Sequence, residues 1–210
     1  MAITKGHWLL LLFTLTYTLG FGAYYVSIQN LEFLWYVATL LGLIVFIGTT
    51  LKHSQLPSWV LWLLSLWGLL HMAGGGVVVG DSALYRYLIW PFYVDGVDPD
   101  FVIFKFDQFV HAYGFGISAI ALLLIFERWT KGTVGPRALA ATAVLSAMGL
   151  GVANEIVEFA AVIVFSETGV GGYYNVSLDL VFNTLGALIA IGLLYIVRRL
   201  KNHDGRKSQS

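Results

Sequence analysis

The chain has 210 residues, of which 58% are hydrophobic and only 11% are charged, whereas charged residues make up about 25% of an ordinary soluble domain. Its mean hydropathy is +0.78, and it contains repeated apolar runs close to the length of about 20 residues that crosses a bilayer. The net charge of zero gives no sign of a nucleic-acid partner, and the absence of cysteine excludes disulfides, thiolate metal ligands and a cysteine nucleophile.

Six apolar runs predict an all-α, polytopic membrane protein, with one transmembrane bundle over residues 1–200 and a disordered cytoplasmic tail over residues 201–210. The first run exceeds the signal-peptide core of about 7–15 residues and has no small-x-small cleavage site, so we expect a retained helix. The predicted spans are about Trp8 to Val26, Phe33 to Leu51, Pro57 to Val79, Gln108 to Phe126, Pro136 to Phe165 and Leu178 to Val197.

The basic residues predict which side of the membrane each loop faces, because Lys and Arg collect in cytoplasmic loops. If the N-terminus is inside, ten Lys and Arg residues fall on the inner side and only Arg86 and Lys105 on the outer side. We therefore expect both termini in the cytoplasm and a multi-pass protein of the cytoplasmic (inner) membrane. Residues 80–105 then form a long outer loop, whose aromatic residues suit the headgroup layer.

Polar residues recur on single faces of four of these runs. Asp107 and His111 are four residues apart, so both leave the same face of a helix. The other three runs carry polar groups beside small residues in the same way, which is typical of close helix contact around a buried site. The groups are His71 in the third run, Asn154, Glu155 and Glu158 in the fifth, and Asp179 and Asn183 in the sixth.

The predicted directions of the helices place all these groups in the outer half of the bilayer. His71 lies roughly 20 Å along an outward-running helix, at about 1.5 Å per residue. Glu155 and Glu158 lie near the outer end of theirs, and Asp107 and Asp179 lie near the start of inward-running helices. Ionisable groups at membrane depth are costly unless they are paired or ligated, so their coincidence in one layer indicates a functional site.

Each group also has a plainer explanation when it is taken singly. Asp107 and Asp179 are near helix N-termini, where capping and the helix dipole favour a carboxylate. His71 fits a neutral packing histidine with one interhelical hydrogen bond, and Glu158 fits a side chain that faces headgroup water. Glu155 has no such explanation at its depth.

Imidazoles and carboxylates without thiolates form a ligand set for zinc, manganese, iron or magnesium. We expect one such divalent metal ion as cofactor, with Glu158 and Glu155 as catalytic acids or bases. Arg86 and Asn183 are the predicted substrate-binding residues, and either Arg86 or Lys105 would bind an anionic headgroup. The predicted metal ligands are His71, Asp107, His111, Glu155 and Asp179.

Four motifs in this order resemble the YjdF-type family of bacterial inner-membrane proteins, whose function is unassigned. More distantly, the Asp-x3-His, Glu and Asp-x3-Asn-x2-Gly elements are similar to VanZ-like membrane proteins, some of which are linked to glycopeptide resistance. The resemblance implies membership and the same site residues, without naming a reaction. The motifs are His71-Met72-x-Gly74-Gly75, Phe106-Asp107-x3-His111, Asn154-Glu155-x2-Glu158-Phe159, and Tyr173 through Asp179 to Gly186-Ala187.

Three functions compete for this pattern. The first is a metal-dependent enzyme that acts on a lipid or lipid-linked envelope substrate at the outer leaflet, with membrane lipids as partners. The second is a proton- or cation-coupled transporter, but the inner half of the predicted bundle has no ionisable residue to complete a path, and no inverted repeat is evident. The third is a scaffold whose polar groups only fix helix packing. The sequence indicates no oligomeric state.

Small residues on the polar faces also predict where helices pack closely. We expect Gly114 and Gly186 at helix contacts, because a larger side chain there would overpack the interface. We expect Ile120 and Leu193 to face lipid.

The predicted topology can be tested with reporter fusions. Fusions after Lys52, after Lys131 and at the C-terminus should report a cytoplasmic location, since basic residues surround these points. Fusions near Asp95 and Gly171 should report an external location. A cytoplasmic signal at Gly171 would contradict the placement of the polar groups in the outer half of the bilayer.

Overall fold

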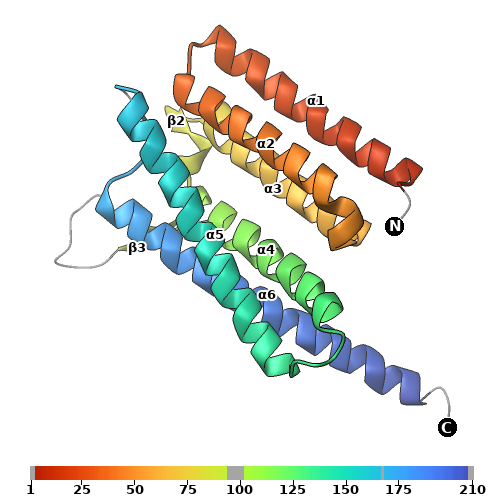
Figure 1. Ribbon diagram of the computed structural model, residues 1–210. Helices are drawn as coiled ribbons and strands as arrows, with labels where there is room; N and C mark the ends of the chain where they lie inside the picture. Colours follow the sequence, from red (N-terminus) through yellow and green to blue (C-terminus); the bar gives the residue numbers. More distant parts are fainter. Residues whose placement is uncertain (1–2, 94–101, 167, 208–210) are drawn as a thin grey trace.

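A computed structural model describes residues 3–93, 102–166 and 168–207, and within them it confirms the six predicted spans. Both ends of the chain lie at the same end of the helix bundle (Figure 1). Each helix is long and apolar enough to cross a membrane. The helices are α1 (Lys5–Ser27), α2 (Leu31–Ser54), α3 (Ser58–Gly76), α4 (Phe106–Thr130), α5 (Pro136–Val164) and α6 (Tyr173–Lys207).

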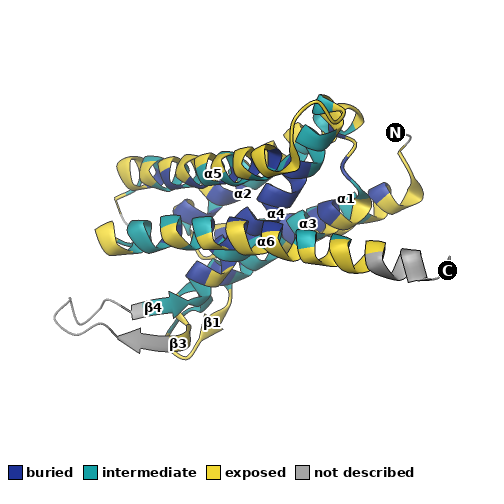
Figure 2. Ribbon diagram, turned by 90° about the horizontal axis from the view of Figure 1, so that it is seen from below, coloured by how far each residue is buried: buried dark blue, intermediate teal, exposed yellow. Residues whose placement is uncertain are grey.

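Helix α4 is the centre of the bundle. In its most apolar window 61% of the residues are buried, against 17–33% in the other five helices. It packs against α3, α5 and α6, while α1 and α2 pack with α3 on the other side of the molecule. Figure 2 shows the buried residues on the faces turned toward the middle of the bundle and the exposed residues on its outside.

Glycines allow the closest of these contacts, between α4 and α6. A Cβ atom added at Gly186 would overlap the backbone of Ala112, and one added at Gly116 would lie 2.9 Å from the Gly186 carbonyl oxygen. Gly114 likewise makes room for the indole of Trp67 on α3. The predicted packing roles of Gly114 and Gly186 are therefore confirmed.

The prediction that Ile120 faces lipid is wrong. Ile120 belongs to the main hydrophobic core, together with residues of α3, α5 and α6. The reason is that α4 is surrounded by other helices along most of its length, so its apolar faces meet protein instead of lipid. Leu193, on the outer helix α6, is 56% exposed as expected.

The predicted outer loop contains short strands. Helix α3 ends at Gly76, before the predicted end at Val79, because the chain turns there into the pair β1 (Val78–Val79) and β2 (Ser82–Ala83). The 3-10 turn η1 (Leu84–Arg86) follows, and then the antiparallel pair β3 (Leu88–Tyr93) and β4 (Val102–Lys105). This segment lies at the end of the bundle opposite the termini (Figure 2). Asp95 lies outside the described residues.

Helix α6 begins before Leu178 and continues to Lys207, so residues 201–207 are helical in the structure instead of disordered as predicted. No proline interrupts this stretch, and its basic residues favour a helix C-terminus through the dipole. Residues 208–210 lie outside the described range. Two hydrogen bonds from Arg198 to Glu127, of 2.6 and 3.0 Å, join α6 to α4 at this end of the bundle.

The α4–α6 contact can be tested with a matched pair of substitutions on α6. Gly186→Ala should lower the free energy of unfolding by about 1–3 kcal/mol, because the new methyl group meets the Ala112 backbone. Gly192→Ala should not lower it, since nothing lies within 4 Å of a Cβ atom at that position. Unfolding in mixed micelles with increasing sodium dodecyl sulfate provides the measurement. Equal effects of the two changes would show that the contact is not close.

Candidate carboxylate and imidazole site

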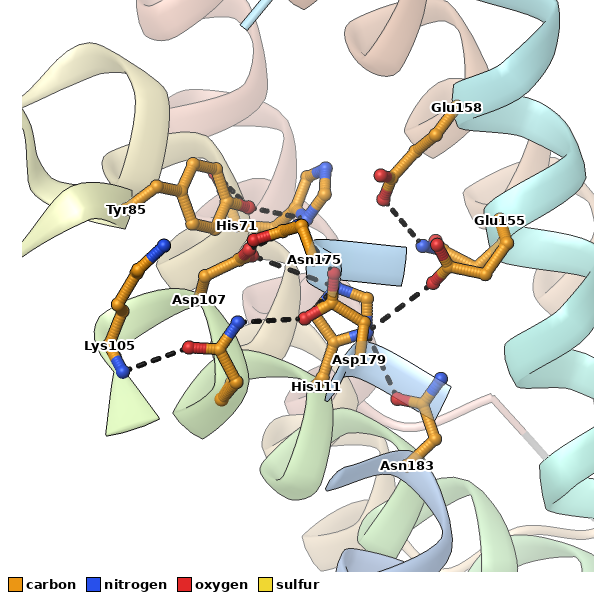
Figure 3. A network of polar contacts seen from close by, with 12 residues as sticks. His71, Tyr85, Lys105, Asp107, His111, Glu155, Glu158, Asn175, Asp179 and Asn183 are labelled. Atoms are coloured by element: carbon orange, nitrogen blue, oxygen red, sulfur yellow. Dashed lines mark hydrogen bonds and ion pairs between the residues drawn. The ribbon is translucent and has the colours of Figure 1, made fainter. Parts of the chain in front are cut away.

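The polar residues of α4, α5 and α6 converge on His111, which is buried (Figure 3). Its Nε2 atom lies 3.7 Å from Asp107 Oδ1 and 4.0 Å from Asp179 Oδ1. Its Nδ1 atom lies 3.0 Å from Asn183 Oδ1 and 3.8 Å from Glu155 Oε1. One imidazole thus has carboxylates beside both of its nitrogen atoms.

The hydrogen bond to Asn183 determines which nitrogen of His111 can bind a cation. The amide oxygen of Asn183 only accepts, so the Nδ1 atom of His111 carries the proton that is donated to it. A neutral imidazole protonated at Nδ1 has its lone pair on Nε2. That lone pair is on the side of Asp107 and Asp179.

Side-chain amides hold the two aspartates in place. Gln108 Nε2 donates to Asp179 Oδ1 over 3.0 Å, and Asn175 Nδ2 donates to Asp179 Oδ2 over 2.6 Å and to Asp107 Oδ2 over 3.2 Å. Gln108 is itself fixed, because its Oε1 accepts from the backbone N–H of Lys105 over 2.8 Å. Second-shell bonds of this kind orient metal ligands.

Helix capping does not explain the two aspartates. The hydrogen bond from the Lys105 N–H to the Gln108 side chain closes the N-terminus of α4, and the Asp107 carboxylate contacts α6 instead. Asp179 is the seventh residue of α6, beyond its first turn, and is 0% exposed. Its carboxylate therefore does not serve the free N–H groups at the start of that helix.

The two glutamates of α5 differ in their surroundings. Glu158 is half-buried and its Oε1 accepts from Asn154 Nδ2 over 2.8 Å. Glu155 is 9% exposed, and both of its carboxylate oxygens are buried without a hydrogen-bond partner among the described residues. An unsatisfied buried carboxylate is costly. Glu155 is directed toward His111 (Figure 3), so its position favours a ligand over a packing role.

Two groups of three side chains are close enough to hold a metal ion. One consists of Asp107, His111 and Asp179, and the other of His111, Glu155 and Glu158, with the ligand atoms of each group within 4.8 Å of one another. Two ligands of one zinc ion lie at most roughly 4.2 Å apart, which is twice a metal–ligand distance of about 2.1 Å. The distances from His111 Nε2 to the two aspartates, 3.7 and 4.0 Å, meet this limit.

His71 has a different set of contacts from the one predicted. Its Nδ1 atom lies 2.6 Å from the Tyr85 hydroxyl, and its ring packs edge-on against Tyr36. Burial raises the pKa of Tyr85 well above its usual value, so this hydroxyl keeps its proton. His71 belongs to neither group of potential metal ligands among the described residues.

The two predicted substrate residues are in different places. Asn183 is buried beside His111 and orients its ring. Arg86 is exposed at the end of η1, and no hydrogen bond or ion pair of the described residues joins it to the cluster.

Several residues of the network were missed by the sequence reasoning. Asn175 had a signal, since Asn175, Asp179 and Asn183 are spaced by four residues on one helix face. Tyr85 had none, because it reaches His71 from the irregular segment after α3. Glu32, at the start of α2, was also missed. It is buried, and it accepts from the Tyr36 hydroxyl over 3.3 Å and from the Gly169 N–H over 2.6 Å.

The fold and the cluster define an integral membrane protein with six transmembrane helices and a buried carboxylate and imidazole site. The chain belongs to the family of predicted membrane proteins DUF2238, whose model matches residues 6–200, and this confirms the resemblance to YjdF-type membrane proteins. No curated protein and no solved structure matches the chain.

The effect of Glu155 on the free energy of unfolding distinguishes a ligand site from a scaffold. In protein stripped of metal, Glu155→Leu should raise the free energy of unfolding by about 1–3 kcal/mol, because it removes a buried carboxylate without hydrogen bonds. The control Glu158→Leu should not, since it leaves the Asn154 amide without its partner. Thermal unfolding in detergent measures both. Destabilisation by Glu155→Leu would support the scaffold instead.

Proposed function

We propose that this protein binds a divalent metal ion through Asp107, His111 and Asp179 and acts as a metal-dependent enzyme on a lipid or lipid-linked envelope substrate. One observation carries the proposal: the unprotonated Nε2 atom of His111 lies within 3.7 and 4.0 Å of two aspartate oxygens, a spacing that one cation can bridge. Zinc, manganese, iron and magnesium all suit this donor set.

The charge of the cluster supports a cation. Four carboxylates surround one imidazole, and the nearby Lys105 ammonium offsets only one of their charges (Figure 3). The described hydrogen bonds to the carboxylates come from amide side chains, which carry no charge. Bringing several carboxylates together at membrane depth is unfavourable unless a positive charge compensates them. A divalent ion provides that charge.

In this proposal the aspartates hold the ion and the glutamates transfer protons. A bound ion of this kind polarises a phosphoryl or acyl group and lowers the pKa of a bound water. Asp179 and Asp107 are fixed by Gln108 and Asn175, which keeps their oxygens in place. Glu155 and Glu158, on the Nδ1 side of His111, are positioned to accept and return a proton.

The location of the site determines the kind of substrate. With both termini in the cytoplasm of a bacterial cell, the cluster lies in the outer half of the inner membrane. A group that reacts at this depth belongs to a molecule that is itself in the bilayer. This favours a lipid or a lipid-linked envelope precursor over a soluble metabolite.

Metal analysis of the purified protein tests the proposal. The wild type should hold one ion, and Asp179→Asn should lose it. Gln108→Leu should weaken binding about 10–100-fold, because it frees the Asp179 carboxylate without removing a ligand. The control Glu127→Gln removes a carboxylate that pairs with Arg198 away from the site, and it should bind normally.

Catalysis requires a second measurement, with the protein incubated in a bacterial polar-lipid extract that is followed by mass spectrometry. Loaded wild type should convert one lipid class, and Glu158→Gln should lose this activity while it keeps its metal. Equal metal contents in wild type and Asp179→Asn would contradict the proposed site. Conversion that persists after chelation would contradict the proposed chemistry.

A further inference from the structure

A large apolar cavity adjoins the polar cluster. Its volume is about 540 Å³, and it lies between α1, α2 and α3 on one side and α4 and α5 on the other. At the end near the chain termini it is lined by His7 and Leu51, and at the other end by Tyr36, His71 and Asn154. Between these ends its walls are mainly leucine, isoleucine and aromatic side chains.

The cavity is long. Its lining residues on α2 run from Tyr36 to Leu51, fifteen residues along one helix, which corresponds to roughly 22 Å at about 1.5 Å per residue. One leaflet contributes about 15 Å of a hydrocarbon core of about 30 Å. The cavity therefore extends past the middle of the bilayer. Its volume is within the range of about 300–1,000 Å³ found for sites that hold one ligand.

One side of the cavity opens toward lipid. Leu43 and Phe46 on α2 and Leu150 on α5 line it, although they are 43%, 63% and 47% exposed. Helices α2 and α5 meet nearer the end of the bundle opposite the chain termini, where Trp35 Nε1 donates to the Val157 carbonyl oxygen over 3.2 Å. We place one opening between α2 and α5, on the side of this hydrogen bond that is nearer to the chain termini; the exposed side chains of Ile3 and Trp8 line the cavity at that same end.

The polar end of the cavity is continuous with the cluster. Asn154 lines the cavity and donates to Glu158, and His71 lines it and pairs with Tyr85 (Figure 3). An apolar cavity that ends at the His71 imidazole and at Asn154, the hydrogen-bond partner of Glu158, is complementary to an amphiphile with one tail and one polar head. A cation bound in the cluster would add attraction for an anionic head.

We propose that this cavity binds the single hydrocarbon chain of a long membrane amphiphile, which enters between α2 and α5 and places an anionic head of the phosphate type at the cluster. This rests on the proposed function for the head, whereas the tail site rests on the cavity alone. We expect one tail and not two, because the lining residues enclose a single apolar cavity of about 540 Å³. The substrate is then a long-chain phosphate ester and not a bulk phospholipid.

Two glycines of α2 provide a matched pair of variants for the test. Neither Gly48 nor Gly42 has any atom within 4 Å of an added Cβ, so both accept a larger side chain without a clash. Gly48 lines the cavity and Gly42 does not. Gly48→Phe therefore fills the channel near its inner end, while Gly42→Phe makes the same chemical change on another face of the helix.

The probe is a long single-chain alkyl monophosphate with a diazirine at the end of its tail. The full-length protein is placed in vesicles of phosphatidylethanolamine and phosphatidylglycerol, irradiated, and mapped by mass spectrometry. Label should appear at the inner end of the cavity, on Leu51, Leu56 or Ile125. Gly48→Phe should reduce this label about tenfold, as expected for 1.4 kcal/mol of lost binding free energy, and Gly42→Phe should leave it unchanged.

Three outcomes would overturn the tail site: label on outward-facing Leu188 and Ile189 of α6, equal label in the two variants, or loss of label when part of the vesicle phospholipid is replaced by two-chain phosphatidic acid at a constant mole fraction of probe. Metal content, measured on the same samples, separates the two proposals, and thermal unfolding in detergent shows that Gly48→Phe is folded. Label in the cavity without metal would sustain the tail site and contradict the proposed function. Bound metal with label only on the outer surface would support the proposed metal site and contradict the tail site.

Discussion

The backbone contact between α4 and α6 is the constraint on which the site depends. Because Gly186 lies directly against Ala112, the two helices run together closely enough for short side chains to meet between them. Asp179 and Asn183, about two turns and one turn before Gly186, therefore reach His111. At a wider helix spacing these side chains would not reach His111, because the aspartate side chain has only one methylene group. Helix association in membranes relies on this type of contact between small residues.

The same contact explains why the polar cluster is tolerated in the bundle. Around the aspartates nearly every oxygen has an amide donor, and the donors come from the two helices in contact. On the α5 side the satisfaction is incomplete, because both Glu155 oxygens and the Asn183 Nδ2 atom are buried without a hydrogen-bond partner among the described residues. A network that existed only to fix helix packing would gain from satisfying these atoms. Buried polar atoms without hydrogen bonds on one side of a network that is nearly complete elsewhere are typical of a ligand-binding site.

Most of the fold followed from the sequence, since long apolar runs without charges have few alternatives in a bilayer. The convergence of Asp107, His111, Glu155 and Asp179 also followed, because spacing of three or four residues defines a helix face. Which face of α4 meets lipid did not follow: Ile120 is apolar and would suit either environment, and only the number of neighbouring helices decides. His71 was predicted as a ligand because of its depth and because it shares a helix face with small residues. Its actual partner, Tyr85, lies fourteen residues away in an irregular segment, where no periodicity reveals a contact.

Glu32 gives the end of the bundle opposite the chain termini a further property. Its carboxylate binds the Gly169 N–H of the connection between α5 and α6, so α2 is tied to that connection, close to where Trp35 joins α2 to α5. These bonds hold two halves of the bundle together on the side of the cluster that is nearer to water. Exchange of the proposed amphiphile would then proceed by sideways diffusion within the membrane. Occupancy would follow the mole fraction of that amphiphile among the surrounding lipids, so that dilution with inert lipid would lower it while dilution of the whole suspension with buffer would not.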